Sequence, residues 1–363
     1  MVWGCGIRAA EGPDLAVVSN SQQDYVQDES GKHNEEDVSR VGQTHVPYYR
    51  SRWQYGSGRG HESRGRVSGT ACGARGAAWS ARVTLKLVAL DIDGTIVGSD
   101  FALPGEVIQA VGKLHAAGIA VTLATGRMLR STRGFAERLG IGGPVICYQG
   151  ALTAEAASGR YIRHEGLAPQ VARDALERLS EFAGFGGQVL MYVGDEVYST
   201  ARTEWSDGYE HRMGLEVNLV DSLDDLVEDD LYGDLAGREP TLILAVDTPD
   251  VIAELAGRLR AEMDGKALIT HSLPHFCEIG SLRAGKSSAL AHLAGSMGIG
   301  RGEVIAFGDG SGDAEMLRWA GVGVAMSGGH PEAIAAADRV VEGPPGAAVA
   351  ELLMGCLEGG AFE

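Results

Sequence analysis

Two carboxylates one residue apart follow a short apolar run, and no other feature of the sequence is better suited to chemistry. Residues 85–90 read LKLVAL, and Asp91 and Asp93 come next, before a Gly-Thr turn. A run of this length and composition predicts a buried β-strand. Ligands of open α/β sheets bind at the carboxyl ends of strands, and acids there lose hydration unless a cation or a reaction uses them. The alternative is a solvated turn, since Asp and Gly are common turn residues.

Three further polar groups stand at the ends of predicted strands or the start of a predicted helix. Thr125-Gly126-Arg127 follows the apolar run 119–124, Lys286 opens a helix, and Asp309 begins the segment DGSGD that ends at Asp313. If the sheet is parallel, all the strand ends meet at one edge. That edge would then hold four carboxylates, one hydroxyl and one ammonium group.

This combination of side chains suits phosphoryl transfer. Four acids crowded together need a hard cation, and oxygen ligands at an open site favour Mg²⁺. A carboxylate beside Mg²⁺ can attack phosphorus and form an aspartyl-phosphate. A hydroxyl, backbone N–H groups and a lysine would neutralise the charge that develops on the transferred group.

The elements that must position these groups alternate between strand and helix from Val83 onward. Apolar runs at 85–90, 119–124 and 144–147 are separated by helical patterns, and this βαβαβ order predicts a doubly wound parallel sheet. Residues 167–275 differ, since hairpin signals mix with helices there and predict an inserted α+β domain. We therefore expect two domains, a core of residues 83–166 and 276–363 and a cap of residues 167–275.

Residues 1–82 differ from the rest of the chain. They are rich in Gly, Ser, Arg and Gln, and no helical or strand period runs through them. Such a segment cannot bury enough apolar surface to offset the entropy of ordering, so we expect a disordered extension. It also holds Trp3, Trp53 and Trp79, which is unusual for a solvated tail. One hypothesis is a misassigned start, with the native protein beginning near Val83.

The composition of the chain limits which binding partners and which cellular compartment we expect. The chain has 31 Lys and Arg against 49 Asp and Glu, a net charge of −18, which disfavours nucleic acid as a partner. No apolar run approaches the ~18 residues that span a membrane, so no membrane association is expected. The five cysteines are scattered without a CxxC pair, and no signal peptide is evident, so we expect a cytoplasmic protein. Oligomeric state is left open.

The ordered set of motifs resembles the haloacid dehalogenase (HAD) superfamily, specifically its Cof-type phosphatases. The sequence contains, in order, D-x-D-G-T from Asp91, T-G-R from Thr125, a helix-opening Lys286, and G-D-G-x-x-D from Gly308. The resemblance covers residues 84–355. It implies a Rossmann-like parallel-sheet core, a cap inserted after the third strand, and hydrolysis of a small phosphorylated metabolite such as a sugar phosphate or a phosphorylated cofactor.

The resemblance also implies roles for the acidic residues. Asp91 would be the nucleophile, and Asp93 the general acid that then activates water as a base. The main-chain carbonyl of Asp93 would join Asp91 and Asp309 around Mg²⁺. Asp313 would hold a metal-bound water or ligate the ion directly.

The remaining motif residues would bind the phosphoryl group. By resemblance, Thr125 and the Gly126 N–H would contact its oxygens, and Lys286 would bridge nucleophile and phosphate. Arg127 is assigned to substrate binding, with a structural ion pair as the alternative.

Two positions depart from the pattern of the family. Gly312 stands where an Asn usually helps to hold the phosphate, and Gln149 stands where Asn-Gly-Ala usually begins after the third strand. Neither change removes the nucleophile, the acid, the metal ligands or the lysine. Gln149 offers a longer amide that reaches a different position.

Two other functions remain open at this point. Residues 280–287 fit the phosphate loop G-x-x-x-x-G-K-[ST] after a predicted strand at 276–279, which is the pattern of an NTPase. That reading leaves Asp91, Asp93 and Thr125 without a role, and 53 glycines make chance matches frequent. The other alternative is an inactive protein on the same fold that only binds a phosphorylated ligand, and Gly312 is the residue that supports it.

Overall fold

The structure is a computed structural model that describes residues 85–184, 186–206, 216–227, 239–270 and 274–358. The predicted extension 1–82 lies outside these residues. Within them, no helix is long and apolar enough to cross a lipid bilayer.

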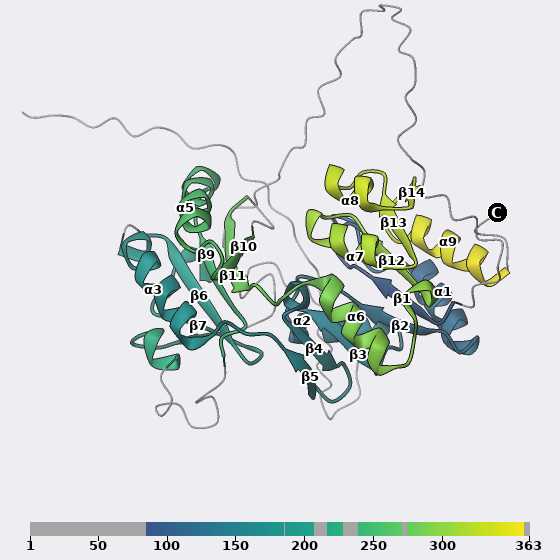
Figure 1. The fold of residues 1–363 in the computed structure, drawn as a ribbon, viewed down its shortest axis with the longest axis horizontal. Helices are drawn as coiled ribbons and strands as arrows, with labels where there is room; N and C mark the ends of the chain where they lie inside the picture. Colours follow the sequence, from purple (N-terminus) through teal and green to yellow (C-terminus); the bar gives the residue numbers. More distant parts are fainter. Residues whose placement is uncertain (1–84, 185, 207–215, 228–238, 271–273, 359–363) are drawn as a thin grey trace, which may run out of the picture. The chain divides into compact units, whose positions relative to one another are not determined.

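A five-stranded parallel sheet forms the core, as the alternating pattern predicts (Figure 1). β1 lies inside the sheet, where Leu90 is in register with Phe307 of β12, the central strand, on one side and with Leu123 of β2 on the other. All four residues of β1 are buried, which explains why the run is apolar throughout instead of alternating. The strands, in spatial order, are β14 (Arg339–Val341), β13 (Val322–Met326), β12 (Val304–Gly308), β1 (Leu87–Leu90) and β2 (Ala120–Leu123).

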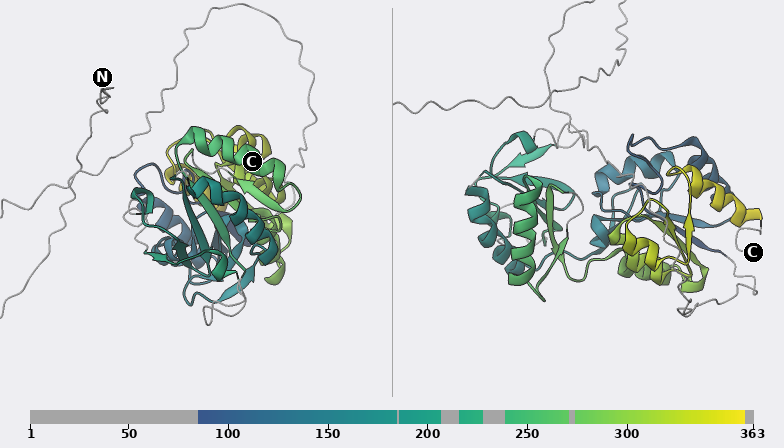
Figure 2. Two further views of the ribbon diagram at one scale, coloured as in Figure 1. Left: turned by 90° about the vertical axis from the view of Figure 1, so that its left-hand side faces the viewer. Right: turned by 90° about the horizontal axis from the view of Figure 1, so that it is seen from above.

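Helices cover both faces of this sheet, so the fold is doubly wound (Figure 2). Val88 and Leu90 pack in one cluster with Val111 of α1, while Leu87 lies in a separate cluster with Leu290 of α6. Successive strand residues point to opposite faces, so one strand supplies both layers. The helices of the core are α1 (Gly105–Ala116), α2 (Leu129–Arg138), α6 (Lys286–Ser296), α7 (Ala314–Trp319), α8 (Pro331–Ala336) and α9 (Ala347–Glu358).

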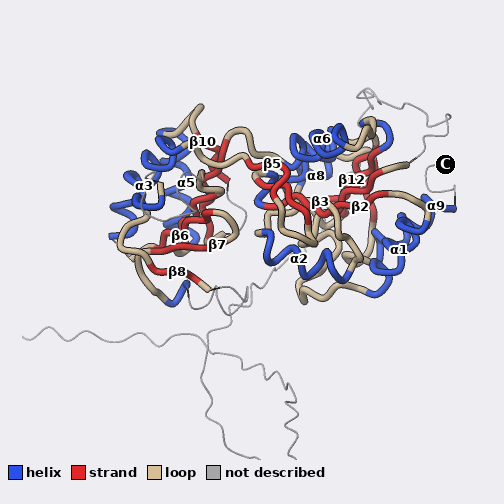
Figure 3. The backbone as a smooth tube through the Cα atoms, turned by 90° about the horizontal axis from the view of Figure 1, so that it is seen from below, coloured by secondary structure: helices blue, strands red, loops and turns tan. Residues whose placement is uncertain are grey.

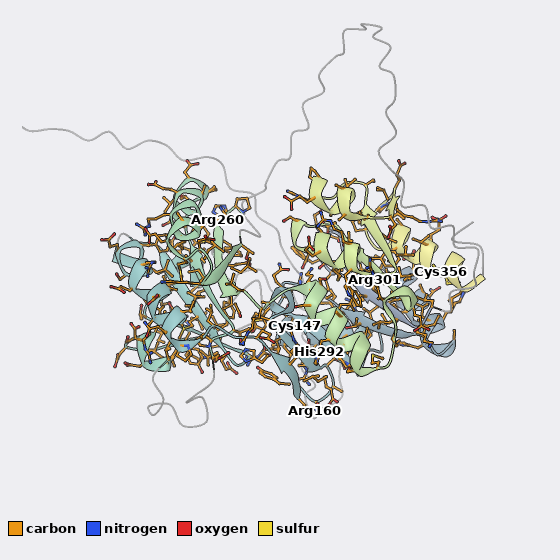
Figure 4. All side chains as sticks on the ribbon, viewed as in Figure 1. Cys147, Arg160, Arg260, His292, Arg301 and Cys356 are labelled. Carbon is orange, nitrogen blue, oxygen red and sulfur yellow. The ribbon has the colours of Figure 1, made fainter. Side chains whose placement is uncertain are left out.

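The third predicted strand is present but takes a different place from the one expected. β3 (Pro144–Cys147) contacts the end of β2 through a parallel bridge between Ile146 and Ala124 and a hydrogen bond from the Thr122 hydroxyl to the Pro144 carbonyl, and it pairs antiparallel with β4 (Leu152–Glu155). β5 (Tyr161–His164) completes this three-stranded sheet, and Arg160, labelled in Figure 4, lies in the turn between β4 and β5. The reason is the tight turn after β3, which sends the chain back along the strand and which hydrophobic periodicity does not reveal.

A second sheet of six strands, with α3 (Pro169–Gly184) and α5 (Pro249–Glu262), forms the inserted α+β part (Figure 3). Its pairings are antiparallel except for that between β7 and β8. The helices and the sheet share one apolar cluster that includes Leu176 and Ile243. The strands, in spatial order, are β10 (Ala267–Thr270), β11 (Phe276–Ser281), β9 (Leu242–Val246), β6 (Gln188–Val193), β7 (Glu196–Ser199) and β8 (Val217–Leu219).

The pairing of β11 affects where the insert ends. We expected the core to resume at residue 276, yet Phe276–Ser281 pairs antiparallel with β9 and β10 inside the six-stranded sheet. An apolar run before a turn reads equally well as a core strand, so its partners could not be predicted. The division into core and cap remains our proposal, and we now place its second boundary after Ser281.

Candidate active site

A buried ion pair joins the end of β1 to the start of α6. Asp91 directly follows β1 and Lys286 is the first residue of α6, and each is only 5% exposed. The Lys286 Nζ lies 2.7 Å from Asp91 Oδ1 and 2.6 Å from Asp313 Oδ1. One ammonium group thus holds two carboxylates that come from distant parts of the sequence.

The environment shifts the pKa of both Asp91 and Lys286. Burial, followed by the Asp313 carboxylate, raises the pKa of Asp91 well above its usual range, although Lys286 opposes the change. For Lys286, burial alone would lower the pKa, but the charges of Asp313 and Asp91 outweigh it and raise the pKa instead. The charged form of the lysine is therefore favoured, and a further cation near Asp91 would favour its ionised form.

Three carboxylates meet at this edge of the sheet. Oxygens of Asp91, Asp309 and Asp313 all lie within 4.8 Å of one another. Burial raises the pKa of Asp309 to about 6, with the Thr95 hydroxyl opposing the rise and the Asp313 carboxylate adding to it. A cluster of oxygen donors with excess negative charge suits Mg²⁺. The predicted metal ligands Asp91, Asp309 and Asp313 are therefore brought together.

Backbone groups and a hydroxyl fix the orientation of these acids. The N–H groups of Asp309 and Gly310 donate to Asp313 Oδ2 at 3.1 and 2.8 Å, and the Thr95 hydroxyl donates to Asp309 Oδ1 at 2.9 Å. Thr95 is fully buried, and we assigned it no role from the sequence. Its place in the D-x-D-G-T motif was the signal that could have revealed it.

The side chain of Asp93 lies apart from the carboxylate cluster and pairs with Arg127. The Nε and a terminal nitrogen of Arg127 donate to the two oxygens of Asp93 at 2.7 and 2.6 Å. The guanidinium also lies over the ring of Phe135, 4.9 Å from its centre. Arg127 thus makes the structural ion pair that was the alternative to substrate binding. Among the predicted metal ligands, Asp93 would have only its main-chain carbonyl to offer.

Thr125 and Gly126 stand at the end of the neighbouring strand. β2 pairs with β1, and Thr125 follows two residues after Leu123, so both lie at the carboxyl edge of the sheet. The hydroxyl of Thr125 is buried and accepts the Arg127 N–H at 3.2 Å, which shapes the turn. The exposed Gly126 faces the carboxamide of Gln149.

The segment that fits a phosphate loop has another context. In a phosphate loop the lysine reaches bound phosphates from a loop that follows a parallel strand. Here β11 lies in the antiparallel sheet, and the ammonium of Lys286 is buried between two carboxylates. The geometry favours the carboxylate site over an NTPase.

Comparison with known proteins gives a consistent result. The family model of haloacid dehalogenase-like hydrolases matches residues 88–353, a range that contains all four motifs. The HMP-PP phosphatase of Cronobacter sakazakii is 28% identical over 254 residues, which cover 69% of this chain and 87% of that protein.

Solved structures share the fold. A Thermotoga maritima protein superposes with a TM-score of 0.65 and 25% identity, over 75% of this chain and 97% of the other. A haloacid dehalogenase-like hydrolase from B. subtilis superposes with a TM-score of 0.62 and 25% identity, over 74% of this chain and 99% of the other. These likenesses confirm the resemblance seen in the motifs. The chain is therefore an enzyme of the haloacid dehalogenase-like hydrolase family.

Proposed function

We propose that the protein is a Mg²⁺-dependent phosphatase that hydrolyses a small phosphomonoester through an aspartyl-phosphate on Asp91. The observation that carries this proposal is a buried carboxylate in contact with Lys286, inside a cluster of three acids at the carboxyl edge of a parallel sheet. The relative from Cronobacter sakazakii, which is named a phosphatase, supports the same reaction class.

The acids form the proposed metal site. The carboxylates of Asp91, Asp309 and Asp313, with the main-chain carbonyl of Asp93, would hold Mg²⁺. Bound Mg²⁺ would neutralise charge on the phosphoryl oxygens and polarise them. The raised pKa values of Asp91 and Asp309, caused first by burial, fit this role, because a bound cation would favour the ionised carboxylates and offset the rise.

The reaction divides into two displacements at phosphorus. The Asp91 carboxylate attacks, the bond from phosphorus to the alcohol oxygen breaks, and Asp93 gives its proton to the departing oxygen. Asp93 then takes a proton from water, the resulting hydroxide attacks phosphorus, and the bond to Asp91 breaks to release inorganic phosphate. Each half uses the same acid and base in opposite directions.

The phosphoryl group needs donors around it. The Thr125 hydroxyl, the Gly126 N–H and the Lys286 ammonium are our candidates, since they stand at the same edge as Asp91. Arg127 remains a candidate substrate contact, because a phosphate would compete with Asp93 for its N–H groups.

The substrate class that we favour is a phosphorylated metabolite, such as a sugar phosphate or a phosphorylated cofactor. The six-stranded insert would act as a cap that excludes bulk water during transfer. A chain of net charge −18 disfavours nucleic acid as the phosphate donor.

The test replaces the nucleophile. Asp91→Asn is expected to reduce hydrolysis of p-nitrophenyl phosphate by at least about 10³-fold, because covalent catalysis is lost. EDTA should abolish wild-type activity, and excess Mg²⁺ should restore it. The matched control is Asp264→Asn, an exposed acid in the cap, which should match wild type. Full activity in Asp91→Asn would refute the mechanism. Phosphate binding without turnover at any Mg²⁺ concentration would favour the inactive binding protein.

A further inference from the structure

The side chain of Gln149 occupies the space between two glycines of the proposed site. A Cβ atom on Gly126 would lie 2.6 Å from Gln149 Nε2, and one on Gly312 would lie 3.1 Å from Gln149 Oε1. Both glycines are exposed, while Gln149 is half-buried. The carboxamide therefore lies beside both the turn after β2 and the turn after β12, and a side chain at either glycine would require the carboxamide to shift.

The backbone that carries Gln149 is strained. Tyr148, Gln149 and Gly150 all have positive φ, at 50°, 53° and 94°. For residues other than glycine such conformations are strained, and they persist where the surroundings impose them. The strain concerns the residues immediately after β3, the same turn that sends β4 back along that strand.

Several contacts hold this turn in place. The Gln149 N–H donates to the Thr125 carbonyl at 3.1 Å, and a Cβ on Gly150 would lie 2.2 Å from the carbonyl carbon of Gly285. The Tyr148 hydroxyl donates to Asp195 in the turn between β6 and β7 at 3.2 Å. The turn that carries Gln149 thus has contacts with both the core and the insert.

One end of the carboxamide has no partner. Gln149 Oε1 is buried without a hydrogen bond, and the described residues contain only two other side-chain atoms of this kind. An unpaired buried acceptor destabilises the folded protein, and a methionine of similar length would avoid this loss. The oxygen and nitrogen of an amide exchange places by rotation with little steric change, so the group can present a donor or an acceptor.

We propose that the Gln149 carboxamide binds the transferred phosphoryl group and supplies the side-chain donor that Gly312 lacks. The inference rests on the proposed function. Its Nε2 group would donate to a phosphoryl oxygen held by Thr125 and the Gly126 N–H. Gly312 leaves the room that the longer side chain of Gln149 needs.

The first experiment separates this role from simple space filling. Gln149→Met keeps length and approximate volume but removes both polar atoms. We expect kcat/KM for p-nitrophenyl phosphate to fall about 10- to 100-fold and inhibition by inorganic phosphate to weaken, as for loss of a hydrogen bond to a charged group. The Tm should stay equal or rise, because the unpaired oxygen is gone.

The matched control removes another buried unpaired oxygen. Thr153 on β4 is fully buried with an unpartnered hydroxyl, and Thr153→Val should leave kcat/KM and phosphate inhibition unchanged. If wild type hydrolyses the aryl phosphate and Gln149→Met equals it in both measurements, the inference is wrong and the proposed function stands. If wild type has no turnover but binds phosphate more tightly than Gln149→Met, the proposed function is wrong and the contact stands.

The second experiment tests the reciprocal fit of the two positions. Gly312→Asn should lose at least tenfold in kcat/KM, since its Cβ alone would lie 3.1 Å from Oε1 of Gln149. The double variant with Gln149→Gly should recover activity, because the room is vacated and the donor is restored from the other side. A double variant that shows only the sum of the two single losses would contradict the proposed exchange.

Discussion

At the scale of the residue, Lys286 balances the charge of the site. It is the partner of both Asp91 and Asp313, and all three side chains are almost completely buried. A buried ion pair adds little net stability over an apolar core, but loss of one partner leaves an uncompensated charge. The lysine therefore has a structural role before any substrate binds.

Substitution of this lysine should show that role. With EDTA present, Lys286→Met is expected to lower the free energy of unfolding by about 3–5 kcal/mol, measured by urea denaturation. Mg²⁺ should return part of the loss, since a cation can replace the missing charge. Lys86→Met is the control: its pair with Glu303 is exposed and should cost less than about 1 kcal/mol. Equal losses in the two variants would argue against this account.

From the sequence we could predict that the acidic residues lie close together, but not which side chains contact one another. Parallel strands bring their ends to one edge, so Asp91, Asp309 and Asp313 could be expected together. The pairing of Asp93 with Arg127 was left open, because an arginine near a phosphate site suits either partner. The contact of Gln149 with two glycines depends on a left-handed turn, which residue spacing does not encode.

At the scale of the element, the turn after β1 sets how close two strands can bring their acids. Gly94 has a φ of 83°, and a Cβ there would lie 2.2 Å from Asp309 Oδ2. The turn thus requires glycine both for its conformation and for the approach of the carboxylate. A single position links the geometry of β1 to that of the segment after β12.

Two glycine substitutions separate these requirements. Gly94→Ala is expected to reduce apparent Mg²⁺ affinity at least tenfold, because the methyl group displaces Asp309 from the cluster. Gly118→Ala also forces alanine into positive φ, yet nothing lies within 4 Å of its Cβ, so it should cost only about 1 kcal/mol in stability. The measurement is the Mg²⁺ dependence of activity beside urea unfolding, and equal Mg²⁺ dependence would contradict the prediction.

Strands could be predicted where the hydrophobic pattern of the sequence fits only one type of secondary structure. Apolar runs located β1 and β2 within a few residues. The pairing partners of β3 and β11 could not be predicted, because the sequence of a strand does not specify which neighbouring strand it will pair with. Pairing is decided by turns and by the sheet that needs a strand to cover its core.

At the scale of the whole molecule, stability and metal binding are coupled through pH. The pKa of Asp309 is raised to about 6 from 3.8, so between these values the folded protein holds a proton that the unfolded chain has released. Without metal, the contribution of this group to stability therefore falls as pH rises through that window. In the proposed metal site, Mg²⁺ would bind the ionised carboxylate and oppose the fall.

The gain in Tm on adding saturating Mg²⁺ should consequently grow between about pH 5 and about pH 7. Calorimetric scans with EDTA and with Mg²⁺ at each pH measure it. The Asp309→Asn variant should show a smaller gain with less pH dependence, since one ligand no longer titrates. A gain that is equal at both pH values in wild type would show that these acids do not hold the ion.

The register of the parallel sheet has a consequence for how the chain is made. Leu87 of β1 pairs with Val304 of β12, so β1 lacks one of its two neighbours until most of the protein has been synthesised. The last strand of the six-stranded sheet ends at Ser281, so all of that sheet has been synthesised before β12 begins at Val304. Contacts between residues so far apart in the sequence form slowly, and until β12 pairs with β1 one side of this apolar strand has no neighbour. Translation therefore completes the residues of the six-stranded sheet before those of β12, which β1 needs as its second neighbour.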